Sequence, residues 1–288
     1  MSYKYEDIRN FYFENEIGER IDCQKINGNL FFYNVTGLGY EEEIEYVQIG
    51  DNFIANKRKI KQNQISGDLE FYDMTYDEYC NFIDFILRAS ALRLVYVPKK
   101  NVRTEYYRDI DLFKIDKNEE DEYNILTCPI MMNAKSLWYE QKNIVLTVGE
   151  EEGEIRWDFE WDSRFADYST RNLLFENKGH TEAPIKLEIE GYVKNPSIFI
   201  YKNGELTGSL ELNLELQENE KLIYCTKDTE LVIKKQNTDG TETNLFDLLS
   251  PNFINFIKLN KGVNQVKLLA EEDITKAKLT IYVEYKAV

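Results

Sequence analysis

Apolar and polar residues alternate strictly along several stretches of the second half of the chain. The clearest are residues 185–190, 210–216 and 278–285, where every second residue is apolar and most of the others are charged or polar. A period of two places each set of side chains on its own face of a strand, so each stretch predicts a strand with one face in a core and one in water. The tight-turn dipeptide Asn203-Gly204 marks a hairpin. We therefore expect an antiparallel β-sandwich over residues 143–288.

A helical period occurs in the first half, over residues 76–89. Apolar residues recur there at intervals of three and four, the spacing of one helix face, at Tyr76, Tyr79, Cys80, Ile83, Ile86 and Leu87. Thr75 stands three residues before Glu78, which is typical of a capping box at a helix N-terminus. The pattern predicts one amphipathic helix.

The rest of the first half is rich in aromatic and β-branched residues. Such runs predict strands at 31–35, 92–97, 106–115 and 123–131. The last two flank a strongly charged hairpin tip that includes Glu119–Glu122. We expect a mainly β fold of the α+β kind, with a sandwich-like domain that contains the helix over residues 1–142 and the sandwich over residues 143–288.

Charge removes several classes of function. The chain has 35 basic and 52 acidic residues, a net charge of -17, which disfavours sequence-specific binding of nucleic acid. No apolar stretch approaches the length of a membrane span, and the N-terminal residues have no apolar core of a secretory signal. We expect neither membrane insertion nor secretion.

Two basic clusters interrupt this acidity. The denser one contains Lys57, Arg58, Lys59 and Lys61, and the second contains Lys99, Lys100, Arg103 and Arg108. In an isolated molecule both are solvated surface. In an assembly they are candidates for a surface that docks acidic groups, including those of another copy of this chain.

The sequence contains no recognisable catalytic, metal or cofactor motif. His180 is the one histidine, the four cysteines form no CxxC pair, and phosphate-binding glycine loops are absent. We therefore expect no enzymatic activity, no metal and no cofactor.

One acidic and aromatic stretch leaves two alternatives open. Asp158 and Glu160 alternate with Trp157 and Trp161, a pattern that a glycosidase could use but that a solvated strand face of an acidic chain also produces. Trp157, Trp161 and Tyr168 could form a platform for sugar rings, or they could belong to the core of the sandwich. A carbohydrate-binding module that recognises host cell-wall glycan is therefore the main alternative function.

The order of features and several short motifs carry a family resemblance. In the first half they are the basic-leading strand that begins at Lys57, the Thr75-capped helix, the strand at 92–97, Tyr106-Tyr107-Arg108-Asp109-Ile110 and Ser136-Leu137-Trp138-Tyr139. In the second half they are residues 195–204, 243–249 and 256–262. Together they resemble the siphovirus-type phage distal tail protein family, called Dit.

This resemblance implies a structural protein of the phage tail tip or baseplate. Members of the family form a hexameric ring through the N-terminal domain, which joins the tail tube to the tail-associated host-contact protein and leaves a channel for DNA. Their galectin-like C-terminal sandwich docks receptor-binding or other baseplate proteins. For this chain it implies a homo-hexamer in the virion, assembled in the bacterial host cytoplasm.

In such a ring, the basic residues Lys57, Arg58, Lys59, Lys61, Arg103 and Arg108 are candidates for the subunit interface or for the channel wall. An interface through Lys57–Lys61, facing the acidic tip Glu119–Glu122 of a neighbour, predicts a ring that salt weakens.

Overall fold

The structure is a computed structural model that describes residues 9–24, 28–72, 75–98, 104–147, 172–249, 255–271, 274 and 276–288. The chain divides into two compact units. The first comprises Met1–Glu140 together with Tyr285–Val288, and the second comprises Gln141–Glu284. The last four residues of the chain thus belong to the same unit as its first 140 residues.

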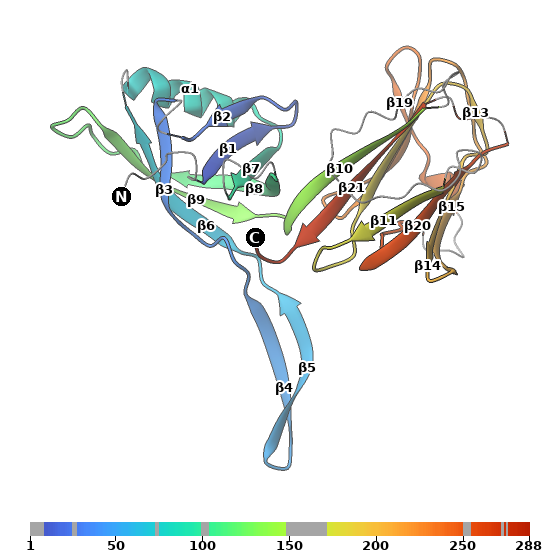
Figure 1. The fold of residues 1–288 in the computed structure, drawn as a ribbon. Helices are drawn as coiled ribbons and strands as arrows, with labels where there is room; N and C mark the ends of the chain where they lie inside the picture. Colours follow the sequence, from blue (N-terminus) through green and yellow to red (C-terminus); the bar gives the residue numbers. More distant parts are fainter. Residues whose placement is uncertain are drawn as a thin grey trace, which may run out of the picture. The chain divides into compact units, whose positions relative to one another are not determined.

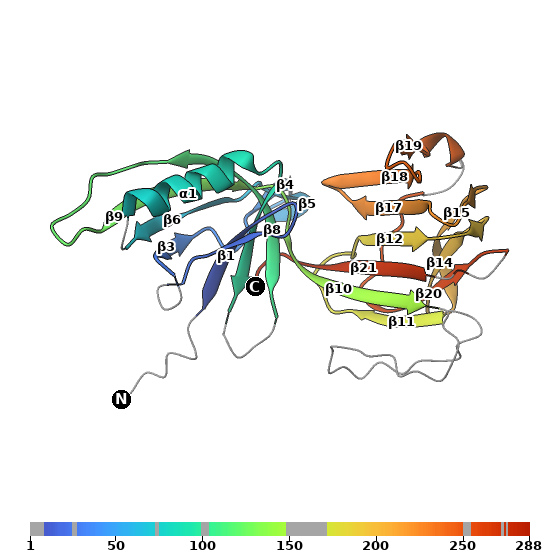
Figure 2. The same cartoon turned by 90° about the horizontal axis from the view of Figure 1, so that it is seen from above.

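Antiparallel strands of the first unit form one curled sheet in the order β2–β1–β7–β8–β9–β6–β3 (Figures 1 and 2). These strands are β1 (Asn10–Asn15), β2 (Arg20–Asp22), β3 (Leu30–Thr36), β6 (Gln64–Phe71), β7 (Leu92–Val97), β8 (Tyr106–Ile115) and β9 (Leu126–Ala134). Phe11 of β1 contacts Phe32 of β3, with ring centroids 5.3 Å apart. Because these strands are far apart in the sheet order, the sheet must curl around a shared core, which gives the sandwich-like form.

The predicted helix is α1 (Thr75–Arg88). It packs on the sheet through Phe82, which is 1% exposed and contacts Phe13 and Phe71. The helix and the β-rich fold class are therefore as the sequence predicts. The buried face differs, because Phe82 was not among the predicted apolar positions and Cys80 and Leu87, which were, are exposed.

The beginning of α1 differs from the expected capping box. The Thr75 hydroxyl donates to the carboxylate of Glu120, and Glu78 accepts a hydrogen bond from the side-chain amide of Asn29. Glu120 belongs to the loop between β8 and β9. The fold thus brings a distant carboxylate to the helix N-terminus, where the helix dipole favours negative charge.

The second unit is an antiparallel sandwich, as its alternating pattern predicts. One sheet has the order β19–β18–β17–β12–β21–β10, the other has the order β11–β20–β14–β15, and β13 pairs with β16. The bounds are β10 (Trp138–Thr147), β11 (Asn172–Asn177), β12 (Ile185–Glu190), β13 (Val193–Lys194), β14 (Ser197–Lys202), β15 (Glu205–Glu211), β16 (Glu215–Leu216), β17 (Lys221–Lys227), β18 (Glu230–Gln236), β19 (Glu242–Asn244), the 3-10 helix η3 (Phe246–Leu248), β20 (Gly262–Leu269) and β21 (Lys276–Tyr285).

Two expected strands are each divided in the structure. The alternating stretch 210–216 ends β15 at Glu211 and resumes in β16, so Leu210 and Leu216 are both buried but belong to different sheets. The stretch that begins at Lys57 is also interrupted, at residues 61–63. Its first part is a strand of a separate hairpin, and its second part is β6.

Candidate functional site: the hairpin arm

That separate hairpin is formed by β4 (Glu42–Ile49) and β5 (Asn52–Ile60), which we call the arm. In the described part of the chain these two strands pair only with each other, and they project from the first unit (Figure 1). Gly50, at the turn, has φ of 63°, a left-handed conformation that glycine adopts without strain. A two-stranded ribbon is only marginally stable in water, so an arm of this kind gains from a partner.

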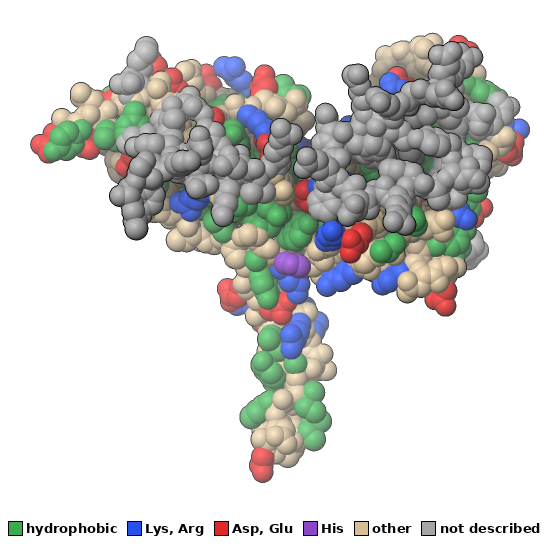
Figure 3. Space-filling view, viewed as in Figure 1, with side chains coloured by type: hydrophobic (Ala, Val, Ile, Leu, Met, Phe, Trp, Pro, Cys, Tyr) green, Lys and Arg blue, Asp and Glu red, His purple; other side chains and the backbone are tan. Residues whose placement is uncertain are grey.

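The outer half of the arm exposes large apolar side chains (Figure 3), and the strand register places them on both faces of the ribbon. The register places Val47 opposite Ile54 on one face and Gln48 opposite Phe53 on the other, because successive residues of a strand alternate in direction. The exposed apolar residues of the outer half and their exposed fractions are Tyr46 (58%), Val47 (47%), Ile49 (60%), Phe53 (66%) and Ile54 (54%). An apolar cluster of this kind is typical of an interface with another protein.

The inner half of the arm carries opposite charges on its two strands. Acidic residues of β4 lie opposite basic residues of β5 in the pairs Glu43–Lys59 and Glu45–Lys57. Arg58 lies 3.9 Å from Glu42, and beyond the arm Lys61 lies 2.6 Å from Glu41. The sequence-predicted cluster Lys57, Arg58, Lys59 and Lys61 therefore lies in and beside the arm, next to acidic groups of its own chain. An acidic neighbour would have to compete with those groups.

Arg108 does not belong to an exposed basic cluster, which corrects the expectation for this residue. It is 2% exposed, its Nε donates to the Ser136 carbonyl at 3.0 Å, and its guanidinium lies 5.3 Å from the centre of the Trp138 ring. Burial lowers the pKa of Arg108 to about 10. A side chain packed in this way cannot present its charge to a neighbour or to a channel.

The other predicted residues lie outside the described part of the chain. They are Lys99, Lys100 and Arg103 of the second basic cluster and Trp157, Trp161 and Tyr168 of the candidate sugar platform, together with Asp158 and Glu160.

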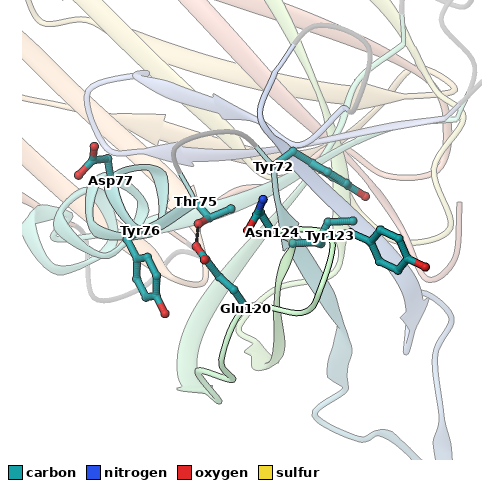
Figure 4. Close-up of a pocket in the computed structure, with 8 residues that line it drawn as sticks. Tyr72, Thr75, Tyr76, Asp77, Glu120, Tyr123 and Asn124 are labelled. Atoms are coloured by element: carbon teal, nitrogen blue, oxygen red, sulfur yellow. Dashed lines mark hydrogen bonds between the residues drawn. The ribbon is translucent and has the colours of Figure 1, made fainter.

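The acidic hairpin tip, residues 119–122, contacts the N-terminal end of α1. Besides the Thr75–Glu120 contact, the Tyr76 hydroxyl donates to Glu119 at 3.1 Å. An open pocket of about 610 Å³ lies here, lined by Tyr72, Thr75, Tyr76, Asp77, Glu120, Tyr123, Asn124 and Ile125 (Figure 4). The side chains of Tyr76 and Tyr123 point away from each other. The pocket does not bring a set of chemical groups to one point, and two carboxylates of the tip already have partners within the chain.

A row of alternating charges crosses one face of the first sheet, and the sequence analysis did not predict it. Arg20, Glu14, Arg93 and Asp109 lie side by side on β2, β1, β7 and β8. Arg20 Nε and Arg93 Nη1 lie 2.7 Å and 2.9 Å from the Glu14 carboxylate, and Arg93 Nε lies 3.7 Å from Asp109. The Glu105 carboxylate, which accepts two hydrogen bonds from Arg20, raises the pKa of that arginine. Only the strand register brings these residues together, so no spacing along the chain reveals the row.

Within the described residues, no group of histidine, cysteine or acidic side chains has the arrangement of a metal site. No helix in that part of the chain is long and apolar enough to cross a membrane.

Solved structures of phage tail proteins have a fold similar to that of this chain. Two similar solved structures are chains of the phage P2 baseplate in its activated conformation, one with Ca and one with Sr; each is 15% identical, with a TM-score of 0.69 over 98% of this chain and 100% of the other. A third is the Dit protein (gp 19.1) of phage SPP1, 11% identical, with a TM-score of 0.54 over 94% of this chain and 98% of the other. At such identities the likeness shows a shared fold. A comparison of the sequence with curated proteins finds no match.

A family match covers most of the first unit. Residues 10–135 match the family described as "Distal tail protein, N-terminal domain". This range includes the curled sheet, α1 and the arm. The chain thus has the N-terminal domain of the phage distal tail protein family, which confirms the family that the sequence motifs indicated.

Proposed function

We propose that this chain is a structural hub of a phage tail tip or baseplate, in which six copies form a closed ring through the first unit. The ring joins the tail tube to the tail-associated host-contact protein and leaves a channel for DNA. The second unit docks receptor-binding or other baseplate proteins. This role includes no catalytic step and no cofactor, and the protein reaches the virion after assembly in the bacterial host cytoplasm. The family match over residues 10–135 and the baseplate chains of similar fold support this role.

The observation that carries the proposal is the exposed apolar outer half of the arm. Its side chains point to both faces of a ribbon that pairs with no further strand in the described part of the chain, and the described residues leave these side chains exposed. A neighbouring copy can, if the arm lies against a different surface of that neighbour. Such a head-to-tail contact either closes into a ring or grows into a filament, and a tail-tip hub with a central channel requires the ring.

The mass of the full chain in solution tests this role. Six chains of 34.1 kDa give about 205 kDa, which sedimentation equilibrium distinguishes from a monomer or dimer. We expect the large species at tens of micromolar, alone or with the tail tube protein added. A monomer under both conditions would contradict the proposal.

Variants of the arm test the surface. The double substitution Phe53→Glu and Ile54→Glu places charges on both faces of the outer half, and we expect it to weaken association about a hundredfold or more, because buried apolar anchors contribute about 2 kcal/mol or more each. The matched control is Leu174→Glu with Val263→Glu, which adds the same charge at exposed apolar positions of the second unit. Equal loss of association in both double variants would remove the arm from the proposal.

A further inference from the structure

The arm joins the first unit through a neck, residues 37–41 and 61–63, in which three consecutive backbone carbonyls accept hydrogen bonds from side chains. The Asn63 amide donates to the carbonyls of Gly37, at 2.9 Å, and Gly39, at 2.5 Å. The indole Nε1 of Trp138 donates to the carbonyl of Leu38 at 2.8 Å. These neck residues lie outside the strands, so no sheet partner supplies these bonds.

Close packing also restricts the neck. Gly37 has φ of 79°, and a Cβ at this position would lie 2.0 Å from the carbonyl oxygen of Gln64 at the start of β6. The neck segment 37–41 therefore lies in direct backbone contact with the start of β6, which only glycine permits. A neck held in this way cannot bend freely.

Trp138 is buried in the first unit and contacts Arg108. It is 0% exposed, and the guanidinium of Arg108 lies over its ring, with Nε bonded to the Ser136 carbonyl. Nη1 of Arg108 is buried without a hydrogen-bond partner among the described residues. Burial of a cation without a carboxylate costs free energy, and contact with an indole face offsets part of this cost. Arg108 thus has the contacts of a residue that orients the indole.

A further contact holds the arm where it begins. Nζ of Lys286 lies 2.6 Å from the Glu42 carboxylate and 5.4 Å from the centre of the Tyr40 ring. Lys286 directly follows β21 and belongs to the segment that returns to the first unit.

We propose that Asn63 and Trp138 are positioning residues that fix the direction in which the arm leaves the first unit, with Arg108 holding the Trp138 indole in place. This assigns a physical role to the motifs Tyr106–Ile110 and Ser136–Tyr139, whose residues Arg108 and Trp138 form this contact. The arm then meets its partner as a preformed element and loses little conformational entropy on binding. That last consequence for assembly rests on the proposed function, whereas the fixed direction of the arm does not.

Single-molecule FRET on the full chain tests the fixed direction. One dye is attached to Cys80, which is exposed on α1, and the other to a cysteine introduced by Asp51→Cys at the turn of the arm; Cys23, Cys128 and Cys225 are buried. At subnanomolar concentration the molecules are separate, so each transfer efficiency reports one arm. The wild type is expected to give one narrow distribution.

The variants Asn63→Ala, Trp138→Phe and Arg108→Met are expected to broaden or shift that distribution. Trp138→Phe keeps an aromatic ring and removes the N–H group, and Asn63→Ala changes a half-buried side chain, so it remains informative if a core variant fails to fold. The matched control is Asn118→Ala in another loop of the same unit. This substitution removes a hydrogen bond of 2.9 Å from the side-chain amide to the Thr127 carbonyl. Distributions identical to the wild type in all three variants would overturn the proposal.

A second readout separates this proposal from the proposed function. If the wild type assembles, the neck variants should associate about tenfold more weakly, the equivalent of about one lost hydrogen bond. If the wild type does not assemble but the neck variants still broaden the FRET distribution, the ring is refuted and the positioning role stands. If assembly is normal and the distributions stay narrow, the positioning role is refuted alone.

Discussion

Glu284 shows how a single partly buried carboxyl group makes the stability of the second unit depend on pH. Its Oε2 accepts a hydrogen bond from the Thr181 hydroxyl at 2.9 Å, and burial raises its pKa despite that bond. A carboxyl group whose pKa is higher in the folded state than in the unfolded state binds more protons when folded. Its ionisation therefore opposes folding, and this cost is present above the folded pKa and absent below the unfolded pKa.

Glu284→Gln should therefore raise the thermal midpoint at pH 7 by a few degrees, because the amide keeps an acceptor for Thr181 and carries no charge. At pH 3, where the carboxyl group is protonated in both states, the variant and the wild type should unfold at the same temperature. Thermal unfolding followed by circular dichroism at the two pH values measures this. The exposed Glu205, changed to Gln, is the control; a lower midpoint for Glu284→Gln at pH 7 would contradict the sign.

At the same scale, sequence reasoning identified residue types more reliably than residue partners. The sequence placed Thr75 at the start of a helix, and it is there, but its hydroxyl contacts Glu120 from a loop rather than forming the expected capping box. Arg108 was grouped with its basic neighbours in the sequence, although the fold buries it over Trp138. Such partners are set by tertiary contacts that no local spacing encodes.

At the scale of elements, the period of hydrophobic residues predicted the strands that have one buried face, and it predicted the helix. Residues 185–190 alternate because one face of β12 packs in the sandwich. In α1 the period identified the helix but not the whole of its buried face, because Phe82 packs on the sheet while Cys80 and Leu87 are exposed. The arm gave no such signal. Its outer half is apolar on both faces, so β4 and β5 have no contrast between a wet and a dry side, and only the pairing register reveals the ribbon.

Close packing within β6 gives a prediction at this scale. A Cβ at Gly67 would lie 2.6 Å from the Phe32 ring and 2.8 Å from the Tyr33 carbonyl oxygen, across the β3–β6 pairing. Gly67→Ala should therefore lower the free energy of unfolding by about 1–3 kcal/mol, the usual cost of overpacking. Gly39→Ala, where a Cβ would meet nothing within 4 Å, should change it by less than about 0.5 kcal/mol. Urea denaturation measures both, and equal stabilities would show that β3 can move away from β6.

At the scale of the whole molecule, the sequence predicted the fold class and the family. The surface available for assembly could not be predicted from the sequence. From the sequence, dense basic clusters were the best docking candidates in a chain of net charge -17. Copies of such a chain repel each other unless basic groups of one face acidic groups of the next. The structure places Lys57, Arg58 and Lys59 beside acidic residues of their own arm and shows an apolar surface farther out.

These two surfaces predict opposite effects of salt. An interface built on the basic cluster loses attraction as salt screens it, so association should weaken from 0.1 M to 1 M NaCl, where the screening length falls from about 10 Å to about 3 Å. An interface built on the apolar outer half keeps its main contribution, while the same screening removes repulsion between copies that each carry a net charge of -17. We therefore expect the full chain to associate at least as tightly at 1 M NaCl as at 0.1 M in sedimentation velocity experiments.

The Phe53→Glu, Ile54→Glu variant should associate weakly at both salt concentrations, because screening cannot restore an apolar contact. If high salt dissociates the wild type, the basic cluster holds the copies together and the apolar outer half of the arm has another partner.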